Sequence, residues 1–157
     1  MVNTTINAVL KSMSRAMEFY HHNLIIELDD AWWTEAGMEN FAPKRKTYRV
    51  DKEKAEGKEI FEIRIDEISP VKRNPGVNIF PNDCINTGRT ARTRVMAILR
   101  WFIDDEAIEP VKVVPESSDS EFRYKLTDGV HRLYCSLAAG FTHVPTIKGF
   151  DWETLDQ

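Results

Sequence analysis

The sequence predicts an α/β domain, more closely an α+β domain, with a small mixed sheet and flanking helices. From residue 59 onward, strand-like and helix-like segments follow in the order strand, helix, strand, strand, helix, strand. Residues 1–58 add a helix, a short strand and a charged hairpin or loop, and we expect this extension to pack on the core formed by residues 59–157. A chain of 157 residues suffices for one hydrophobic core, so we expect one globular unit.

The N-terminal extension carries three local signals. From Thr5 to Tyr20, apolar residues recur at helical spacing, which predicts an amphipathic helix. The run LIIEL, residues 24–28, is typical of a strand. A short helix is expected next, capped by Asp29 or Asp30 and ended by a left-handed Gly37.

A strongly charged tract, residues 43–59, follows this helix, and we expect an exposed hairpin or loop around a short TYRV strand. FEIRID, residues 61–66, alternates apolar and charged residues and predicts a strand with one buried face. Three prolines and two glycines in residues 69–88 predict an irregular loop. Loops of this length in small domains are often functional.

The second half of the chain contains two predicted helices. The first spans residues 87–105, and its expected buried stripe consists of Val95, Ile98, Leu99, Phe102 and Ile103. Strands are expected at residues 109–114 and 122–126. Residues 127–129, TDG, then form a turn into the second helix, residues 130–139. Gly140 ends that helix, and HVPTIKGF returns as a strand.

Composition narrows the function classes. A formal net charge of -4 argues against general nucleic-acid binding, although a local basic surface remains compatible with it. The sequence has no apolar run long enough for a membrane span and no signal peptide, so we expect a cytoplasmic protein without membrane contact. Cys84 and Cys135 lack CxxC spacing, which fits a reducing compartment and argues against a structural zinc site.

The junction at Asp128 and Gly129 is the main candidate site. Glycine lets the backbone approach a ligand closely, and the first amides of the following helix have no intrahelical partners. Such a helix start favours an anion, to which His131 and Arg132 would add side-chain donors. The alternative interpretation is an ordinary turn before a helix, with a solvated arginine.

The run YKLTDGVHRLYCSLAAGFTHVPTI resembles the ParB/sulfiredoxin superfamily, in which a strand leads into a Gly-x-His-Arg type turn, an Ala-rich helix, a Gly and a Val-Pro strand. RIDEISP and IEPVKVV resemble the family's opening strand and the strand before the turn. The similarity covers roughly residues 60–150. It implies that Gly129, Val130, His131 and Arg132 bind the phosphates of ATP, another nucleoside triphosphate or another phosphate ligand, with Mg²⁺ as an optional companion of the nucleotide.

The family's branches differ in activity. Sulfiredoxins use a catalytic cysteine between the motif's Gly and His, and Val130 occupies that place here, so sulfiredoxin activity is not expected. Partition proteins of the ParB type continue into DNA-binding segments after the nucleotide-binding domain. Other relatives are small-molecule kinases, nucleases and nucleotide hydrolases, among which the fold does not choose.

Three residues are candidates for acid-base catalysis: Asp128, Glu109 and His131. Asp128 or Glu109 would handle a metal ion or the nucleophile, and His131 would donate a hydrogen bond to a phosphate oxygen. The alternative for Glu109 is an exposed carboxylate before Pro110. No compact cluster of metal-ligating residues is apparent.

A second basic group stands at the start of the first of these helices. Arg89 and Arg92 are expected on nearly one face, with Thr90 and Thr93 beside them, and would clamp a phosphate from the side opposite the Asp128 turn. Arg94, in the same early turns, is a further candidate for this contact. The alternatives are a solvated basic face, or contact of Arg89, Arg92 and Arg94 with a nucleic-acid backbone.

Adjacent tryptophans Trp32 and Trp33 complete the candidates. One is expected to anchor the N-terminal segment to the core, and the other to line a surface that would suit a protein partner. The leading hypothesis is a nucleoside-phosphate-binding protein that hydrolyses or transfers a phosphoryl group. The competing hypothesis is a non-enzymatic module on the same fold that contacts nucleic acid or protein.

Overall fold

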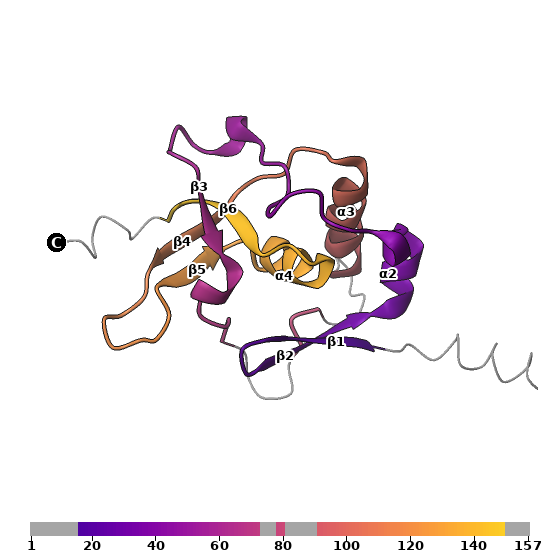
Figure 1. Ribbon diagram of the computed structural model, residues 1–157, viewed down its shortest axis with the longest axis horizontal. Helices are drawn as coiled ribbons and strands as arrows, with labels where there is room; N and C mark the ends of the chain where they lie inside the picture. Colours follow the sequence, from indigo (N-terminus) through magenta and orange to yellow (C-terminus); the bar gives the residue numbers. More distant parts are fainter. Residues whose placement is uncertain (1–15, 73–77, 81–90, 150–157) are drawn as a thin grey trace, which may run out of the picture.

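A computed structural model describes residues 16–72, 78–80 and 91–149 and contains two sheets (Figure 1). A hairpin of two antiparallel strands lies beside a mixed sheet of four strands in the order β3-β6-β4-β5. This architecture confirms the predicted fold class. The elements of the larger unit follow the predicted order: β3 (Phe61–Arg64), α3 (Ala91–Asp104), β4 (Val111–Pro115), β5 (Tyr124–Asp128), α4 (Val130–Ala139) and β6 (His143–Lys148).

Strand β6 is central in the four-stranded sheet. It pairs in parallel with β4 and antiparallel with β3, while β4 pairs antiparallel with β5. Residues 144–147 of β6 are all buried, as expected for a strand covered on both faces. The two parallel strands, β4 and β6, are therefore connected through β5 and α4, which places the start of α4 at the end of β5.

The helices form the core together with the sheet. In Figure 1, α4 lies between the sheet and α3, and α2 (Asp30–Ala36) packs against α3. Leu133 and Tyr134 of α4 and Val95 and Leu99 of α3 are fully buried. Gly140 ends α4 at a φ of 97°, as the sequence predicted.

The strand β1 (Ala16–His21) corrects the prediction of a helix reaching Tyr20. It pairs with β2 (Leu24–Asp29), with Phe19 opposite Ile26. Met17, Phe19 and His21 alternate toward the core, a period of two that also satisfies part of a helical pattern. The rest of the predicted helix, residues 5–15, lies outside the described residues.

Buried His21 fastens this hairpin to the rest of the fold. Its Nε2 lies 3.0 Å from the Ile65 carbonyl oxygen, which only accepts, so Nε2 carries the proton. Its Nδ1 then accepts from the Tyr134 hydroxyl at 2.7 Å, and that hydroxyl accepts from the Val71 amide at 3.1 Å. Burial lowers the pKa of His21 and favours this neutral form.

The side chain of Asn78 hydrogen-bonds to the main chain of β2, the second strand of the hairpin. Its Oδ1 accepts from the Glu27 amide at 3.2 Å, and its Nδ2 donates to the Glu27 carbonyl at 2.7 Å. Nδ2 also donates to the Phe80 carbonyl at 2.9 Å. The amide thus takes the place of a neighbouring strand at one residue of β2.

The predicted short helix is confirmed as α2. Asp29 caps it by accepting from the Ala31 amide at 2.9 Å, and Gly37 ends it at a φ of 86°. Trp32 is buried, and Trp33 is partly buried against the same core. The core role of this pair is therefore confirmed, whereas its role in binding a partner stays a prediction.

The charged tract differs from its prediction at TYRV, which is not a strand. Val50 forms a single parallel bridge to Ile108, and Tyr48 turns inward so that its hydroxyl donates to the Glu109 carbonyl at 2.6 Å. Tyr48 joins a hydrophobic cluster that contains residues from both sides of position 59, which makes the extension part of one core. None of the helices in the described ranges is long and apolar enough to cross a bilayer.

Strand boundaries shift by a few residues. The strand predicted at 61–66 ends at Arg64 and continues as a 3₁₀ turn, Ile65–Glu67. Strand β5 runs to Asp128 and so includes two residues predicted to belong to the turn. The reversal therefore falls on Gly129 alone.

Candidate functional site

A cavity of about 640 Å³ lies between α3, residues 107–109 and the junction of β5 with α4. Eight residues named for the site by the sequence analysis line it together: Thr93, Arg94, Glu109, Asp128, Gly129, Val130, His131 and Arg132. The other lining residues are Lys54, Ala97, Ile98, Trp101, Ala107, Ile108 and Thr127. The structure thus brings the Asp128 turn and the α3 helix to one cavity, whereas a ligand in it stays a prediction.

The basic residues of α3 divide between two locations. Arg94 is exposed and lines the cavity. Arg92 lies outside it and binds the Glu35 carboxylate of α2 at 2.7 Å. Its predicted partners Arg89 and Thr90 lie outside the described residues. Arg94 is therefore the α3 arginine placed for a ligand in this cavity.

Gly129 is required at the start of α4 for two reasons. Its φ of 105° is unfavourable for residues with a side chain, and a Cβ there would lie 2.8 Å from Cγ1 of Val111. No side chain caps the helix, and the Leu133 amide is the first to bond within it, to the Gly129 carbonyl at 2.9 Å. The helix therefore starts directly at the cavity wall, where its dipole favours an anion.

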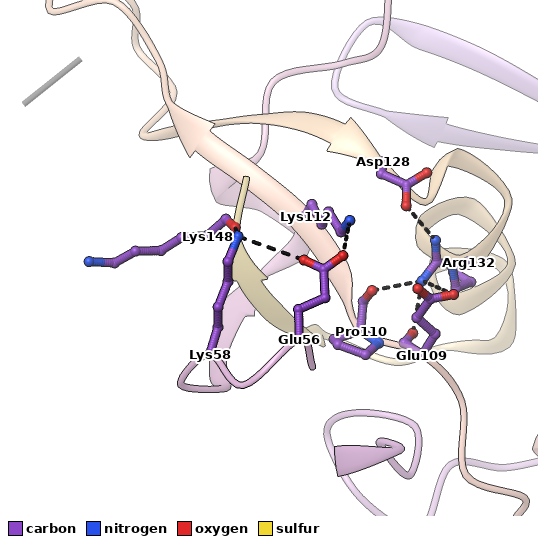
Figure 2. Close-up of polar contacts among 8 residues, drawn as sticks. All are labelled: Glu56, Lys58, Glu109, Pro110, Lys112, Asp128, Arg132 and Lys148. Atoms are coloured by element: carbon purple, nitrogen blue, oxygen red, sulfur yellow. Dashed lines mark hydrogen bonds and ion pairs between the residues drawn. The ribbon is translucent and has the colours of Figure 1, made fainter. Parts of the chain in front are cut away.

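Arg132 binds protein groups at the cavity edge (Figure 2). Its Nη1 donates to the carbonyls of Pro110 at 2.7 Å and Glu109 at 3.1 Å, and Nη2 donates to Asp128 Oδ2 at 3.2 Å. Its side chain is only 14% exposed. These contacts fasten the first turn of α4 to the segment before β4, so a phosphate would have to compete with them for the guanidinium.

The two candidate catalytic carboxylates flank Arg132 in Figure 2. Asp128 pairs with its Nη2, and Glu109 Oε2 lies 3.6 Å from its Nη1. Both carboxylates are about half exposed. Both carboxylates line the cavity, but each already offsets part of the positive charge of the Arg132 guanidinium.

A neighbouring ion-pair network stands beside these residues. Lys112 is the cross-strand partner of Asp128 and binds Glu56 Oε1 at 2.7 Å. Lys58 approaches the other Glu56 oxygen at 3.7 Å and donates to the Lys148 carbonyl at 2.9 Å (Figure 2). The hydrogen bond from Lys112 is the main reason why the pKa of Glu56 is lowered. This network ties the 52–58 loop, which supplies Lys54 to the cavity, to the sheet.

His131 is partly buried and packs its ring 5.6 Å from the ring of Phe80, which is itself buried. It also lines the cavity, so this residue connects the loop after β3 with the candidate site. Phe80 was not predicted as part of the site, and the loop that carries it was predicted only as irregular.

The cavity is mixed in character. Lys54, Arg94 and Arg132 give the lining a small positive excess over Glu109 and Asp128, and the rest of the lining is largely apolar. Trp101 is 42% exposed there. Lys54 and Trp101 were not predicted for the site. Trp101 was detectable in principle, because it shares a helical face with Arg94.

The buried stripe of α3 needs one correction. Ile103 was predicted to be buried and is 42% exposed, whereas Met96 is buried in addition to the other predicted residues. The buried face has turned toward α2 and α4, which both contact α3, and this places Ile103 at its margin.

Cofactor chemistry has a limited basis here. Within the described ranges, no group of three or more His, Cys, Asp or Glu residues could hold a metal ion. The cavity volume is in the ordinary range for small-molecule sites, so a nucleotide fits by size. Cys135 is fully buried, and burial raises the pKa of its thiol, which makes it an inert core residue.

A comparison of the chain with protein-family models, with curated proteins and with solved structures finds no match in any of the three. The resemblance to the ParB/sulfiredoxin superfamily therefore stays a prediction.

Proposed function

We propose that the cavity between α3 and the β5–α4 junction binds a phosphate-bearing ligand of the nucleoside phosphate class. The observation that carries the proposal is the convergence of an uncapped helix start with the exposed Arg94 and Lys54 on one cavity. An anion at Gly129 would complement the α4 dipole, and Arg94 would donate from the opposite wall.

In this proposal Arg132 chiefly holds the turn, whereas its motif implied that it binds the phosphate directly. Because its Nη1 and Nη2 already bind Glu109, Pro110 and Asp128, it serves chiefly to hold the turn and adds positive potential from the edge. Its partner Asp128 would repel a phosphate placed directly on the guanidinium. The ligand charge is therefore expected to rest on the α4 amides, Arg94 and Lys54.

Hydrolysis or phosphoryl transfer is the reaction to test. Asp128 or Glu109 would orient a nucleophile, or Mg²⁺ bound with the phosphates, and His131 would donate to a phosphate oxygen. Either carboxylate would first have to loosen its contact with Arg132. Binding without turnover is therefore the form of the proposal that the geometry supports best.

The test is calorimetric titration with ATP, ADP, CTP and GTP in the presence of Mg²⁺. The variant is Arg94→Ala, and the matched control is Arg100→Ala, another exposed arginine of α3 that does not line the cavity. We expect at least one nucleotide to bind, with about tenfold weaker binding in Arg94→Ala and no change in Arg100→Ala. Absence of heat with all four nucleotides would refute the proposal.

The nucleic-acid hypothesis predicts a different result in the same variants. Binding of a DNA or RNA duplex would weaken steeply with salt, and loss of Arg94 and Arg100 would add. Arg92 supports this alternative less than the sequence suggested, because Glu35 neutralises it. A salt titration with a short duplex therefore separates the two functions.

A further inference from the structure

Trp101 is an exposed aromatic residue whose position the proposed phosphate site does not explain. It lies in the middle of the last half of α3 and is 42% exposed. It lines both the cavity at the start of α4 and a second cavity beside Phe41 and Ile103. Covering the exposed part of its indole with a ligand would therefore add hydrophobic free energy to binding. Its neighbours in the cavity are also apolar, namely Ala97, Ile98 and Ile108.

The residues that α3 presents to the cavity form one stripe. Thr93, Arg94, Ala97, Ile98 and Trp101 follow each other at intervals of one, three, one and three residues, which places them on a single face of the helix. Arg94 and Trp101 are two turns apart, about 10 Å along the axis. The charged end of the stripe is thus separated from the aromatic end by a fixed, helix-defined spacing.

Small side chains lie between these two ends. Ala97 occupies the stripe between Arg94 and Trp101, and Ala107 lines the cavity from the segment that follows α3. Along α3, the wall of the cavity therefore runs from the cationic Arg94 through the small Ala97 to the aromatic Trp101.

We infer that Trp101 is the platform on which the base of the ligand stacks, so that the cavity recognises a nucleotide by its ring as well as by its phosphates. The inference rests on the proposed function. A nucleoside phosphate fits the order of side chains along α3: the phosphates would lie between Arg94 and the start of α4, the ribose beside Ala97, and the base on the Trp101 indole. Stacking on tryptophan is tolerant of base identity, because every base has a π face.

The experiment compares two probes, the nucleotides and inorganic tripolyphosphate, both with Mg²⁺. Tripolyphosphate has the charge of the triphosphate chain but no ring. In the wild-type protein, at least one of ATP, CTP, GTP and UTP should bind about tenfold or more tightly than tripolyphosphate. Binding of that nucleotide should also quench tryptophan fluorescence, and the quenching should be absent in Trp101→Phe.

Variants locate the effect. Trp101→Ala should weaken nucleotide binding about tenfold and leave tripolyphosphate binding unchanged, whereas Arg94→Ala should weaken both. The matched control is Ile103→Ala, because Ile103 is equally exposed on the same helix and lines only the second cavity that Trp101 also borders. Unchanged nucleotide binding in Ile103→Ala would assign the effect of Trp101 to the cavity at the start of α4. Circular dichroism of each variant reports folding, and Trp101→Phe, which keeps a ring, should retain most of the nucleotide affinity.

The outcomes separate the two proposals. Equal affinities for tripolyphosphate and for every nucleotide, or an unchanged nucleotide affinity in Trp101→Ala, would overturn the role of Trp101 while leaving the phosphate site standing. If neither probe binds, the phosphate site itself fails, and the inference fails with it.

Discussion

Replacing Arg132 with Met tests whether this arginine holds the fold or waits for a ligand. Methionine keeps an apolar stem of similar length but removes the donors to the Glu109 and Pro110 carbonyls. Hydrogen bonds to a charged group contribute about 1.5 to 3 kcal/mol each, and a buried carbonyl left without a donor adds a penalty. The ion pairs with half-exposed Asp128 and Glu109 add little.

We therefore expect Arg132→Met to lower the free energy of unfolding by about 3 kcal/mol, because its side chain is only 14% exposed. Urea denaturation followed by circular dichroism measures this loss, and an unchanged slope would show that the unfolded state is the same. Arg100→Met, on the exposed face of α3, should stay within about 0.5 kcal/mol of the wild type. A loss below about 1 kcal/mol for Arg132→Met would refute the structural role and make the guanidinium available to a phosphate.

Three further predictions follow from the core and the turn. Gly129→Ala should destabilise the protein by about 2 to 4 kcal/mol, because the backbone would be strained and the new Cβ would lie 2.8 Å from Val111. The control is Gly57→Ala, which also has a positive φ but has nothing within 4 Å of the new Cβ. It should cost only about 1 to 2 kcal/mol in the same urea assay. Because burial lowers the pKa of His21 from 6.5, the unfolded chain binds more protons than the folded one below that pH. The free energy of unfolding should therefore fall below about pH 6.5, by up to about 1.4 kcal/mol per pH unit. His21→Gln should flatten that slope in unfolding curves recorded from pH 7 to 5. Cys135 should resist iodoacetamide in the native protein and react in urea, as peptide mass spectrometry would show; rapid native labelling would contradict its burial.

The sequence was sufficient to predict the strand and helix order of the larger unit, because its signals are local. The period of two in FEIRID, the glycines at 129 and 140 and the Asp29 cap each act within a few residues. The start of the chain was harder. Residues 16–20 satisfy both periods, and only pairing with β2 and the buried contacts of His21 decide for a strand.

The site was predictable in its backbone and less so in its side chains. Gly129 needs a positive φ, and that need can be inferred from a turn before a helix. Arg132 binds the Pro110 carbonyl and Arg92 binds Glu35, and both contacts join residues that are distant in sequence. No local sequence pattern encodes such contacts. Lys54 lines the same cavity as Gly129 although more than seventy residues separate the two in sequence, and no local pattern encodes that meeting either.

The amide of Asn78 has a consequence for how the protein behaves at high concentration. An outer strand offers a row of donors and acceptors to any extended chain that meets it, and this is a common route to aggregation. Asn78 occupies both main-chain groups of Glu27 in the middle of β2. An incoming strand would have to displace this side chain before it could pair with β2 at Glu27.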